Sequence, residues 1–145
     1  MTAWPDLAGR IEGGHHILPV RVYFEDTDFS GLAYHGSFVR WCERGRSDWL
    51  RLLGVHHSDL AAGAEPAAFV VRRLMVDYFK PASIDDVLEV VSSCTDLTTA
   101  TLTLAQEVRR KDVLLAKAEV LVVLVSKAGR PMRLPARVRQ VFGGG

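Results

Sequence analysis

The chain has 145 residues, of which 48% are hydrophobic and 24% are charged, as in an ordinary globular domain. Its 18 Lys and Arg nearly balance its 17 Asp and Glu, so no overall basic field favours nucleic acid as a partner. Two cysteines are too few for a disulfide framework, and they lack the spacing of a zinc site. The N-terminal sequence lacks the pattern of a signal peptide and no apolar run reaches about 18 residues, so we expect a cytoplasmic protein without a signal peptide or a transmembrane segment.

The first part of the chain divides into an arm and a strand. Residues 1–17 contain glycines without any periodicity, which predicts a flexible N-terminal arm in which His15 and His16 are solvated. From Leu18 onwards hydrophobic and polar residues alternate, which predicts a half-buried strand. The inward face of this strand is predicted to carry Val20, Val22 and Phe24. We expect residues 18–142 to form a single domain.

The hydrophobic period changes between residues 36 and 53. Apolar residues there recur at steps of three and four, which predicts a helix of about five turns with one apolar stripe. The stripe consists of Phe38, Trp41, Cys42, Gly45, Trp49, Leu52 and Leu53. Gly54 is expected to end the helix in a left-handed conformation, and Gly45 to permit close approach of a strand. A short second helix is expected over residues 58–62.

Strand-like patterns dominate the chain after Pro66. The predicted strands cover residues 67–79, 87–94, 101–108 and 113–125. The connections between the last three are short enough for hairpins, so these strands are expected to be antiparallel. A short tail that ends in a helical turn follows. One long helix and about five strands define an α+β class, and a sheet that curls around one central helix would bury the apolar faces of both.

The stretch from residue 22 to residue 38 places a carboxylate, a glycine turn and a histidine where the first strand meets the long helix. Asp28 ends the run E-D-T-D, and such a carboxylate can attack an acyl carbon or activate water to do so. The ordinary alternative is a turn aspartate that binds its own backbone before Ser30-Gly31. The spacing alone leaves both interpretations open.

Calcium binding is a further alternative, because D-x-D-x-S-G from Asp26 matches the first half of a calcium loop. Such a loop needs a bidentate Glu at its twelfth position, and that position here is Ser37. We therefore predict no metal site.

His35 lies at the expected start of the long helix. The first backbone N–H groups of a helix are unpaired and lie at the positive end of its dipole, so they can stabilise a carbonyl oxygen as negative charge develops. His35 can act through its backbone N–H or its imidazole, or have only a structural role. A Ser or Cys nucleophile is less favoured, because no G-x-S-x-G motif is present and both Cys42 and Cys94 fall on predicted core positions.

Basic residues that could hold a phosphorylated carrier occur in three groups, although each is an ordinary surface charge when taken alone. The groups are Arg109, Arg110 and Lys111; Arg72, Arg73 and Lys80; and Arg133, Arg137 and Arg139.

The motif D-T-D-x-x-G-x-x-Y-H, followed by W-C-E-R-G-R-S, resembles the hotdog-fold acyl-CoA thioesterases. Within them it is most similar to the 4-hydroxybenzoyl-CoA thioesterase-like branch that includes the Tol-Pal-associated bacterial thioesterases. The likeness continues through F-V-V-R-R, D-Y-F-K-P-A, D-D-V-L-E and A-E-V-L-V-V, and so covers about residues 18–142. It implies a five-stranded antiparallel sheet wrapped around one long helix, in a homodimer or homotetramer with active sites at the subunit interface.

The resemblance also implies roles for individual residues. The catalytic carboxylate of the family falls on Asp28, and the position whose backbone N–H polarises the thioester carbonyl falls on His35. Gly31 would allow close approach of backbone and substrate, and Tyr34 would shape the helix entry. The implied substrate is an acyl-CoA or an acyl-carrier-protein thioester, hydrolysed without metal or cofactor.

Two departures from the family pattern bear on this reading. Relatives commonly have a second tyrosine where this chain has Phe24, and the turn at residues 95–100 lacks the basic run of the 4-hydroxybenzoyl-CoA enzymes. Two alternatives on the same fold therefore stay open, namely a non-catalytic acyl-CoA or acyl-carrier binding module and a hydroxyacyl-thioester dehydratase. Release of free thiol would separate hydrolysis from both.

Overall fold

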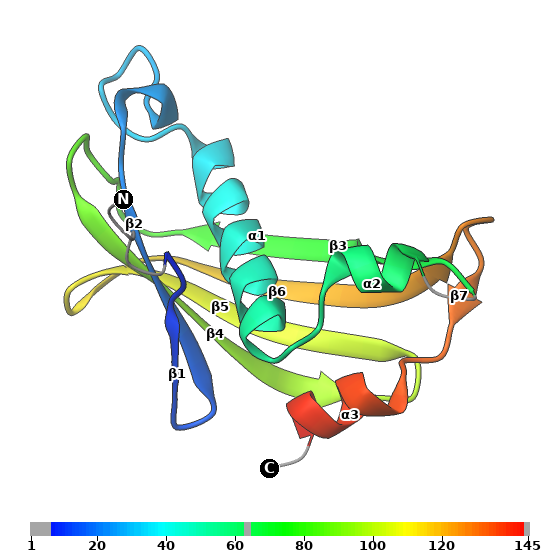
Figure 1. Ribbon diagram of the computed structural model, residues 1–145. Helices are drawn as coiled ribbons and strands as arrows, with labels where there is room; N and C mark the ends of the chain where they lie inside the picture. The colour runs from blue at the N-terminus through cyan, green and yellow to red at the C-terminus, as the bar shows by residue number, and fades with distance from the viewer. Residues whose placement is uncertain (1–6, 63–64, 144–145) are drawn as a thin grey trace, which may run out of the picture.

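The computed structural model describes residues 7–62 and 65–143. One long helix, α1 (His35–Leu52), lies across an antiparallel sheet, and two shorter helices, α2 (His57–Ala62) and α3 (Ala136–Gly143), lie near its C-terminal end (Figure 1). The strands of the sheet are β1 (Arg10–Glu12), β2 (His15–Arg21), β3 (Ala67–Tyr78), β4 (Val87–Leu97), β5 (Thr101–Arg110), β6 (Val113–Ser126) and β7 (Pro131–Met132).

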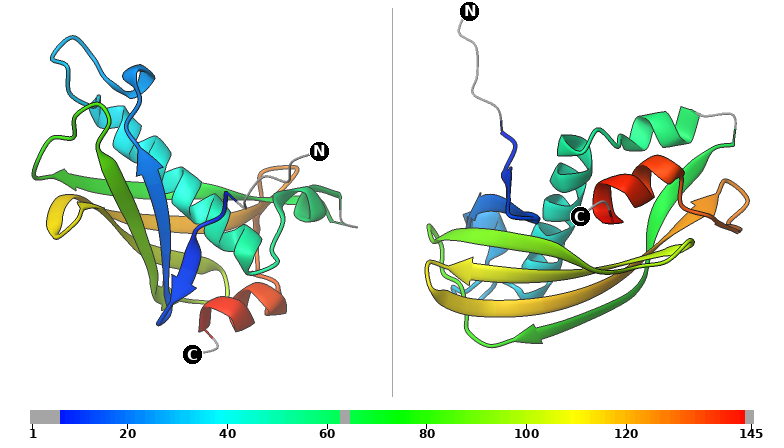
Figure 2. Two further views of the ribbon diagram at one scale, coloured as in Figure 1. Left: turned by 60° about the vertical axis from the view of Figure 1, so that its left-hand side comes forward. Right: turned by 90° about the horizontal axis from the view of Figure 1, so that it is seen from below.

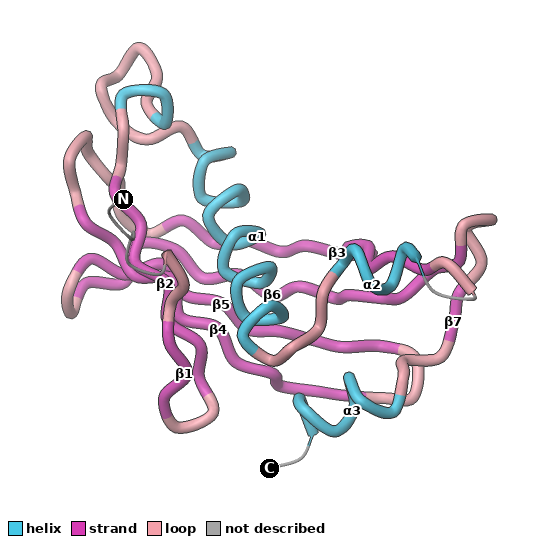
Figure 3. Tube along the Cα trace, viewed as in Figure 1, coloured by secondary structure: helices cyan, strands magenta, loops and turns pink. Residues whose placement is uncertain are grey.

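The strand order is β1-β2-β4-β5-β6-β3, and every pair is antiparallel. The short β7 pairs with residues near the end of β6. These residues of β6 follow the ones that pair with β5. Figure 2 shows the sheet curving around α1, and Figure 3 shows that the long strands form one continuous layer. This arrangement confirms the α+β hotdog architecture expected from the sequence, with five long strands. β1 and β7 are two short additions that were not predicted.

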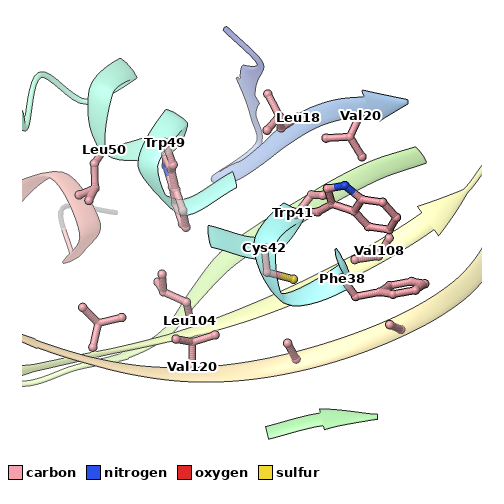
Figure 4. Packing of buried hydrophobic residues seen from close by; sticks show 14 of the residues in the cluster. Leu18, Val20, Phe38, Trp41, Cys42, Trp49, Leu50, Leu104, Val108 and Val120 are labelled. Atoms are coloured by element: carbon pink, nitrogen blue, oxygen red, sulfur yellow. The ribbon is translucent and has the colours of Figure 1, made fainter. Parts of the chain in front are cut away.

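The helix packs its apolar stripe onto the sheet. Phe38, Trp41 and Cys42 are buried against strand residues such as Val108 (Figure 4). The predicted bounds of the helix are correct to within one residue, and Gly54 has the expected positive φ of +79°. At its last turn Leu50 is buried and Leu52 is 38% exposed, so the predicted stripe was wrong for Leu52.

Gly45 lies where α1 comes closest to the sheet. A Cβ atom at this position would lie 3.0 Å from Cγ1 of Val90 and 3.4 Å from Nε2 of Gln106. The close approach predicted for this glycine is therefore confirmed, because a side chain here would crowd Val90 and Gln106 on β4 and β5.

The N-terminal segment corrects the prediction of a loose arm. Residues 10–21 form a β-hairpin in which Gly13 and Gly14 make the turn, both with positive φ. His16 is fully buried and not solvated. Its Nε2 lies 2.6 Å from Oδ2 of Asp48 on α1, and the same carboxylate oxygen accepts a hydrogen bond from the N–H of Gly9. One helix carboxylate thus anchors the hairpin to α1.

In the part of the chain that the structure describes, β3 forms one edge of the sheet and pairs only with β6. A register shift between Val71 and Arg73 interrupts its alternation, and apolar side chains remain exposed along it, including Val70, Val71 and Met75. Apolar side chains exposed along a long edge strand are unusual for a chain without a partner. Within the described residues, no helix is both long enough and apolar enough to cross a membrane.

Candidate active site

The loop between β2 and α1 is joined to the loop between β3 and β4 by backbone hydrogen bonds. Val22 donates to the carbonyl of Asp86 and accepts from the N–H of Asp85, and Ala33 donates to Ala82 at 2.8 Å. These bonds fix the start of α1 against the sheet at one end of the molecule (Figure 1, light blue and green). All four site residues expected from the sequence lie at this junction.

Asp28 is exposed and begins the turn in this loop. Its Oδ1 accepts hydrogen bonds from the hydroxyl and the backbone N–H of Ser30. The hydroxyl of Ser30 is the main reason that the pKa of Asp28 lies below its ordinary value, and the nearby His35 contributes in the same direction. Asp28 therefore makes the hydrogen bonds expected of an ordinary turn aspartate, and the same hydrogen bonds favour its ionised form.

Gly31 completes this turn, and its N–H donates to the carbonyl of Asp28 at 3.0 Å. Its φ is +79°, a conformation that glycine adopts readily and other residues rarely do. A Cβ atom at this position would meet no protein atom within 4 Å. The backbone conformation therefore accounts for the glycine, and the space beside it is open.

The first turn of α1 presents backbone donors. Tyr34 precedes the helix and donates its own N–H to the carbonyl of Asp26, and its carbonyl accepts from Ser37. In the part of the chain that the structure describes, the N–H groups of His35 and Gly36 have no acceptor. Unpaired N–H groups at the positive end of a helix form a ready site for a negatively charged oxygen.

Aromatic rings frame this helix start. The rings of Tyr34 and His35 lie 4.2 Å apart, and the ring of Tyr78 meets that of His35 edge-on at 6.2 Å. The hydroxyl of Tyr78 donates to the carbonyl of His35 at 3.0 Å. Burial raises the pKa of Tyr78, which further favours the protonated hydroxyl that donates this hydrogen bond.

Two residues of this frame were not assigned a role from the sequence. Tyr78 belongs to β3, 43 residues from His35, so no local pattern connects them. The edge of the Tyr34 ring packs against Gly36. A Cβ atom at this position would lie only 2.6 Å from Cε2 of Tyr34. The sequence offered one indication of such a role for Gly36, namely a glycine in the first turn of the predicted helix.

The first aspartate of the motif has a structural role. Asp26 is buried, and its carboxylate accepts a hydrogen bond from the backbone N–H of Tyr23. Its carbonyl accepts from the buried hydroxyl of Ser37, and its carboxylate lies 3.5 Å from the guanidinium of Arg40. These contacts hold the loop on α1 and so position Asp28.

The predicted strand into this loop ends early. β2 stops at Arg21, and Phe24 begins a 3-10 helix, η1 (Phe24–Asp26), with its side chain 79% exposed. The prediction that Phe24 continues the buried face of the strand is therefore wrong, because the backbone is extended up to Tyr23 and turns into the 3-10 helix at Phe24.

The three predicted groups of basic residues are separated in the structure. Arg110 lies beside the site loops, where it donates to the carbonyl of Pro81 and pairs with Asp86 at 2.9 Å. Arg137 instead binds the carbonyl of Leu53, at the opposite end of α1. The predicted core position of Cys42 is confirmed, and burial raises the pKa of its thiol to about 11, which disfavours a role as nucleophile.

Comparison with known proteins agrees with this arrangement. The model of the 4HBT thioesterase superfamily matches residues 30–117. Over 126 residues the chain is 43% identical to the acyl-CoA thioester hydrolase YbgC of Escherichia coli O6:H1 and 36% identical to the acyl-CoA thioesterase YbgC of Haemophilus influenzae. Each match covers 86% of this chain and 92% of the relative.

Solved structures show the same fold. A probable thioesterase from Bartonella henselae superposes with a TM-score of 0.81 at 36% identity, over 83% of this chain and 99% of that one. A 1,4-dihydroxy-2-naphthoyl-CoA thioesterase from Synechocystis gives a TM-score of 0.82 over 90% of this chain and 96% of its own, and its 22% identity supports the fold alone. From the family match and the extent of these identities, the chain belongs to the 4HBT thioesterase superfamily.

Proposed function

We propose that this protein is an acyl-CoA thioesterase that hydrolyses its substrate at the junction of the 22–34 loop and α1. The observation that carries the proposal is the pairing of two features at one point. Hydrogen bonds from Ser30 favour the ionised carboxylate of Asp28, and the N–H groups of His35 and Gly36 at the helix N-terminus have no acceptor among the described residues. Family membership and the similarity to the YbgC proteins support the same activity.

The thioester carbonyl would bind at the start of α1, where the N–H of His35 stabilises the oxygen as it gains negative charge. Asp28 then acts by one of two routes. It attacks the acyl carbon to give an anhydride that water hydrolyses, or it removes a proton from the water that attacks directly. In either route the products are a carboxylic acid and free CoA.

Gly31 and Tyr34 are proposed to contact the substrate. The space beside Gly31 is open, so the acyl-CoA can approach the backbone next to Asp28. The exposed ring of Tyr34 lies against His35 and would form one wall of the entry to the helix start. Arg110 beside the site loops is a candidate for contact with a CoA phosphate.

We further propose that two chains associate through their β3 edges. The exposed Val70, Val71 and Met75 of this edge strand would be covered by a second copy in antiparallel pairing. Light scattering should give at least a dimer for the wild type. A lysine in place of Val71 should shift the protein towards monomer, and an unchanged mass would contradict this interface.

The activity is tested by release of free thiol from acyl-CoAs of increasing length, aliphatic and aromatic, read with DTNB. Asp28→Asn should abolish turnover while the melting temperature and acyl-CoA binding stay close to wild type. Asp85→Asn is the matched control, because Asp85 is an exposed aspartate of the neighbouring loop whose positive φ asparagine also tolerates.

Three outcomes are informative. Turnover by the wild type and by Asp85→Asn, but not by Asp28→Asn, supports the proposal. Retention of more than about a tenth of the rate by Asp28→Asn would remove Asp28 from the mechanism, since loss of an essential general base or nucleophile costs far more. Binding of acyl-CoA without thiol release by the wild type would instead identify a binding module.

A further inference from the structure

Tyr78 makes a contact at the start of α1 that the mechanism proposed above does not use. It is the last residue of β3, and its hydroxyl donates to the backbone carbonyl of His35 at 3.0 Å. His35 is the first residue of α1, and the ordinary partner of its carbonyl within the helix is the N–H of Val39. A carbonyl oxygen has two lone pairs, so it can accept both hydrogen bonds. The sheet therefore supplies a side-chain donor to the peptide unit that joins the first two residues of α1.

The position of the Tyr78 hydroxyl is determined by contacts of its ring and of the backbone that follows it. The ring meets that of the buried Phe38 at 5.5 Å and that of His35 at 6.2 Å, both edge-on. The N–H of Phe79, the next residue, donates to the carbonyl of Leu115 on β6 at 2.8 Å. These contacts hold the hydroxyl at the carbonyl of His35 before any substrate binds.

The carbonyl that Tyr78 contacts belongs to the same peptide unit as the N–H of Gly36. In a helix the carbonyl of a peptide unit points towards the C-terminus and its N–H towards the N-terminus, so the hydroxyl and the peptide form one chain of aligned dipoles. Hydrogen bonds in such a chain polarise one another and become stronger by about 10–30% each. Among the described residues the N–H of Gly36 has no acceptor, so this strengthened donor is available to a ligand.

The N–H of His35 is supported in a different way. Its peptide unit carries the carbonyl of Tyr34, which accepts a hydrogen bond from the backbone N–H of Ser37 at 2.9 Å. Both N–H groups at the helix start thus have a hydrogen-bonded carbonyl behind them. The support from Ser37 is backbone, whereas the support from Tyr78 is a side-chain hydroxyl that a substitution can remove.

We propose that Tyr78 is a positioning residue of the thioester hydrolase. Its hydroxyl polarises and orients the peptide between His35 and Gly36, so that the N–H of Gly36 acts beside that of His35 as a second donor to the thioester oxygen. This inference rests on the proposed function, because it requires the thioester carbonyl to bind at the start of α1. The contribution of the donor grows as the oxygen gains negative charge, so Tyr78 should affect kcat more than KM.

The kinetic test compares thiol release by the wild type and by Tyr78→Phe, with hexanoyl-CoA and benzoyl-CoA. Phenylalanine keeps the ring contacts with Phe38 and His35 and removes the hydroxyl. We expect kcat to fall about threefold to tenfold at a nearly constant KM, because loss of a whole oxyanion donor costs about a hundredfold to a thousandfold and this variant weakens a donor without removing it. Tyr23→Phe is the matched control, because Tyr23 is an exposed tyrosine of the neighbouring loop, and it should keep the wild-type kcat.

A graded substitution separates polarisation from structural support. Tyr78→3-fluorotyrosine, introduced by suppression of a stop codon, makes the phenol a stronger hydrogen-bond donor and leaves the ring in place. At neutral pH kcat should therefore rise in the order phenylalanine, tyrosine, 3-fluorotyrosine at position 78. Any other order would overturn the inference, and the comparison of tyrosine with 3-fluorotyrosine remains decisive if Tyr78→Phe is unstable.

An infrared measurement detects the same effect without turnover. Asp28→Asn is expected to bind acyl-CoA without hydrolysing it, so the carbonyl band of hexanoyl-CoA labelled with ¹³C at that carbon can be observed in the complex. Polarisation by the N–H donors should place this band below that of the free thioester, and addition of Tyr78→Phe should move it part of the way back. A band that does not move would overturn the inference.

Failure of this inference and failure of the proposed function give different results. If the wild type releases no thiol from any acyl-CoA, the proposed function is wrong and the role of Tyr78 falls with it. If the wild type is active and Tyr78→Phe matches its kcat within about twofold, hydrolysis stands and the role of Tyr78 is refuted. A raised KM with a lower melting temperature and an unchanged kcat would also refute it, because the hydroxyl would then have only a structural role.

Discussion

Replacement of the buried Gln106 by leucine should destabilise the protein by an amount that its contacts define. The side chain is fully buried and makes three hydrogen bonds, with Arg46, Cys42 and Ser92. Leucine is similar in size, so little packing is lost, whereas the hydroxyl of Ser92 and one arm of Arg46 lose their partners. At about 1 kcal/mol for each hydrogen bond, the loss is about 3 kcal/mol. For a chain of this length that corresponds to a melting temperature lower by roughly 6–12 °C.

The measurement is urea unfolding at fixed protein concentration, with the slope of the transition compared between variants. Gln140→Leu is the matched control, because Gln140 is an exposed glutamine on α3 and should change the free energy of unfolding by less than about 0.5 kcal/mol. If Gln106→Leu leaves the hydroxyl of Ser92 without its partner, Ser92→Ala should lower the free energy of unfolding less in that background than in wild type. A Gln106→Leu protein within about 0.5 kcal/mol of wild type would refute the reasoning.

Three further predictions concern the hairpin and the catalytic junction. Asp48→Ala leaves the buried His16 and the N–H of Gly9 without their shared acceptor, and should lower the free energy of unfolding by about 3 kcal/mol in a urea titration. Gly36→Ala should leave the free energy of unfolding unchanged or slightly higher, because alanine stabilises a helix by up to about 1 kcal/mol relative to glycine. It should nevertheless lower kcat/KM about tenfold or more, since the new Cβ displaces the ring of Tyr34. Ser30→Ala removes the main cause of the lowered pKa of Asp28, so this pKa rises towards the ordinary value of an aspartate. Activity that needs ionised Asp28 is lost as the pH falls through this pKa, so the acid limb of kcat/KM should move to higher pH, and an unmoved limb would mean that it reports another group.

Periodic elements were the part of the fold that the sequence predicted best. The helix stripe located α1 to within one residue at each end, because its burial follows a single 3.6-residue period. Strand ends were less accurate where bulges occur. β4 continues to Leu97 through a register shift between Cys94 and Asp96, and β5 continues to Arg110 through another after Val108. A bulge breaks the alternation that defines a strand in sequence, so the prediction stopped there.

Long-range contacts account for what the sequence did not reveal. Gly13-Gly14 was interpreted as a sign of flexibility, whereas two consecutive glycines with positive φ form a tight hairpin turn. His16 is buried because of Asp48, a residue 32 positions away. At the site, Asp28, Gly31, Tyr34 and His35 were predicted together because they fall within the one short motif that carries the family resemblance. Tyr78 was missed because only the folded sheet brings it to the helix start.

The two edges of the sheet differ in a way that would limit the size of an assembly. β1 offers only three residues at its edge, all exposed, and an ion pair at 3.1 Å between Arg10 and Glu12 crosses them. β3 offers twelve. If chains join through β3, each pair would end in β1 on both sides, where a further strand could form few backbone hydrogen bonds and would meet charged side chains. Growth by strand addition would then stop at two chains, so the same sheet that favours pairing would oppose fibre formation.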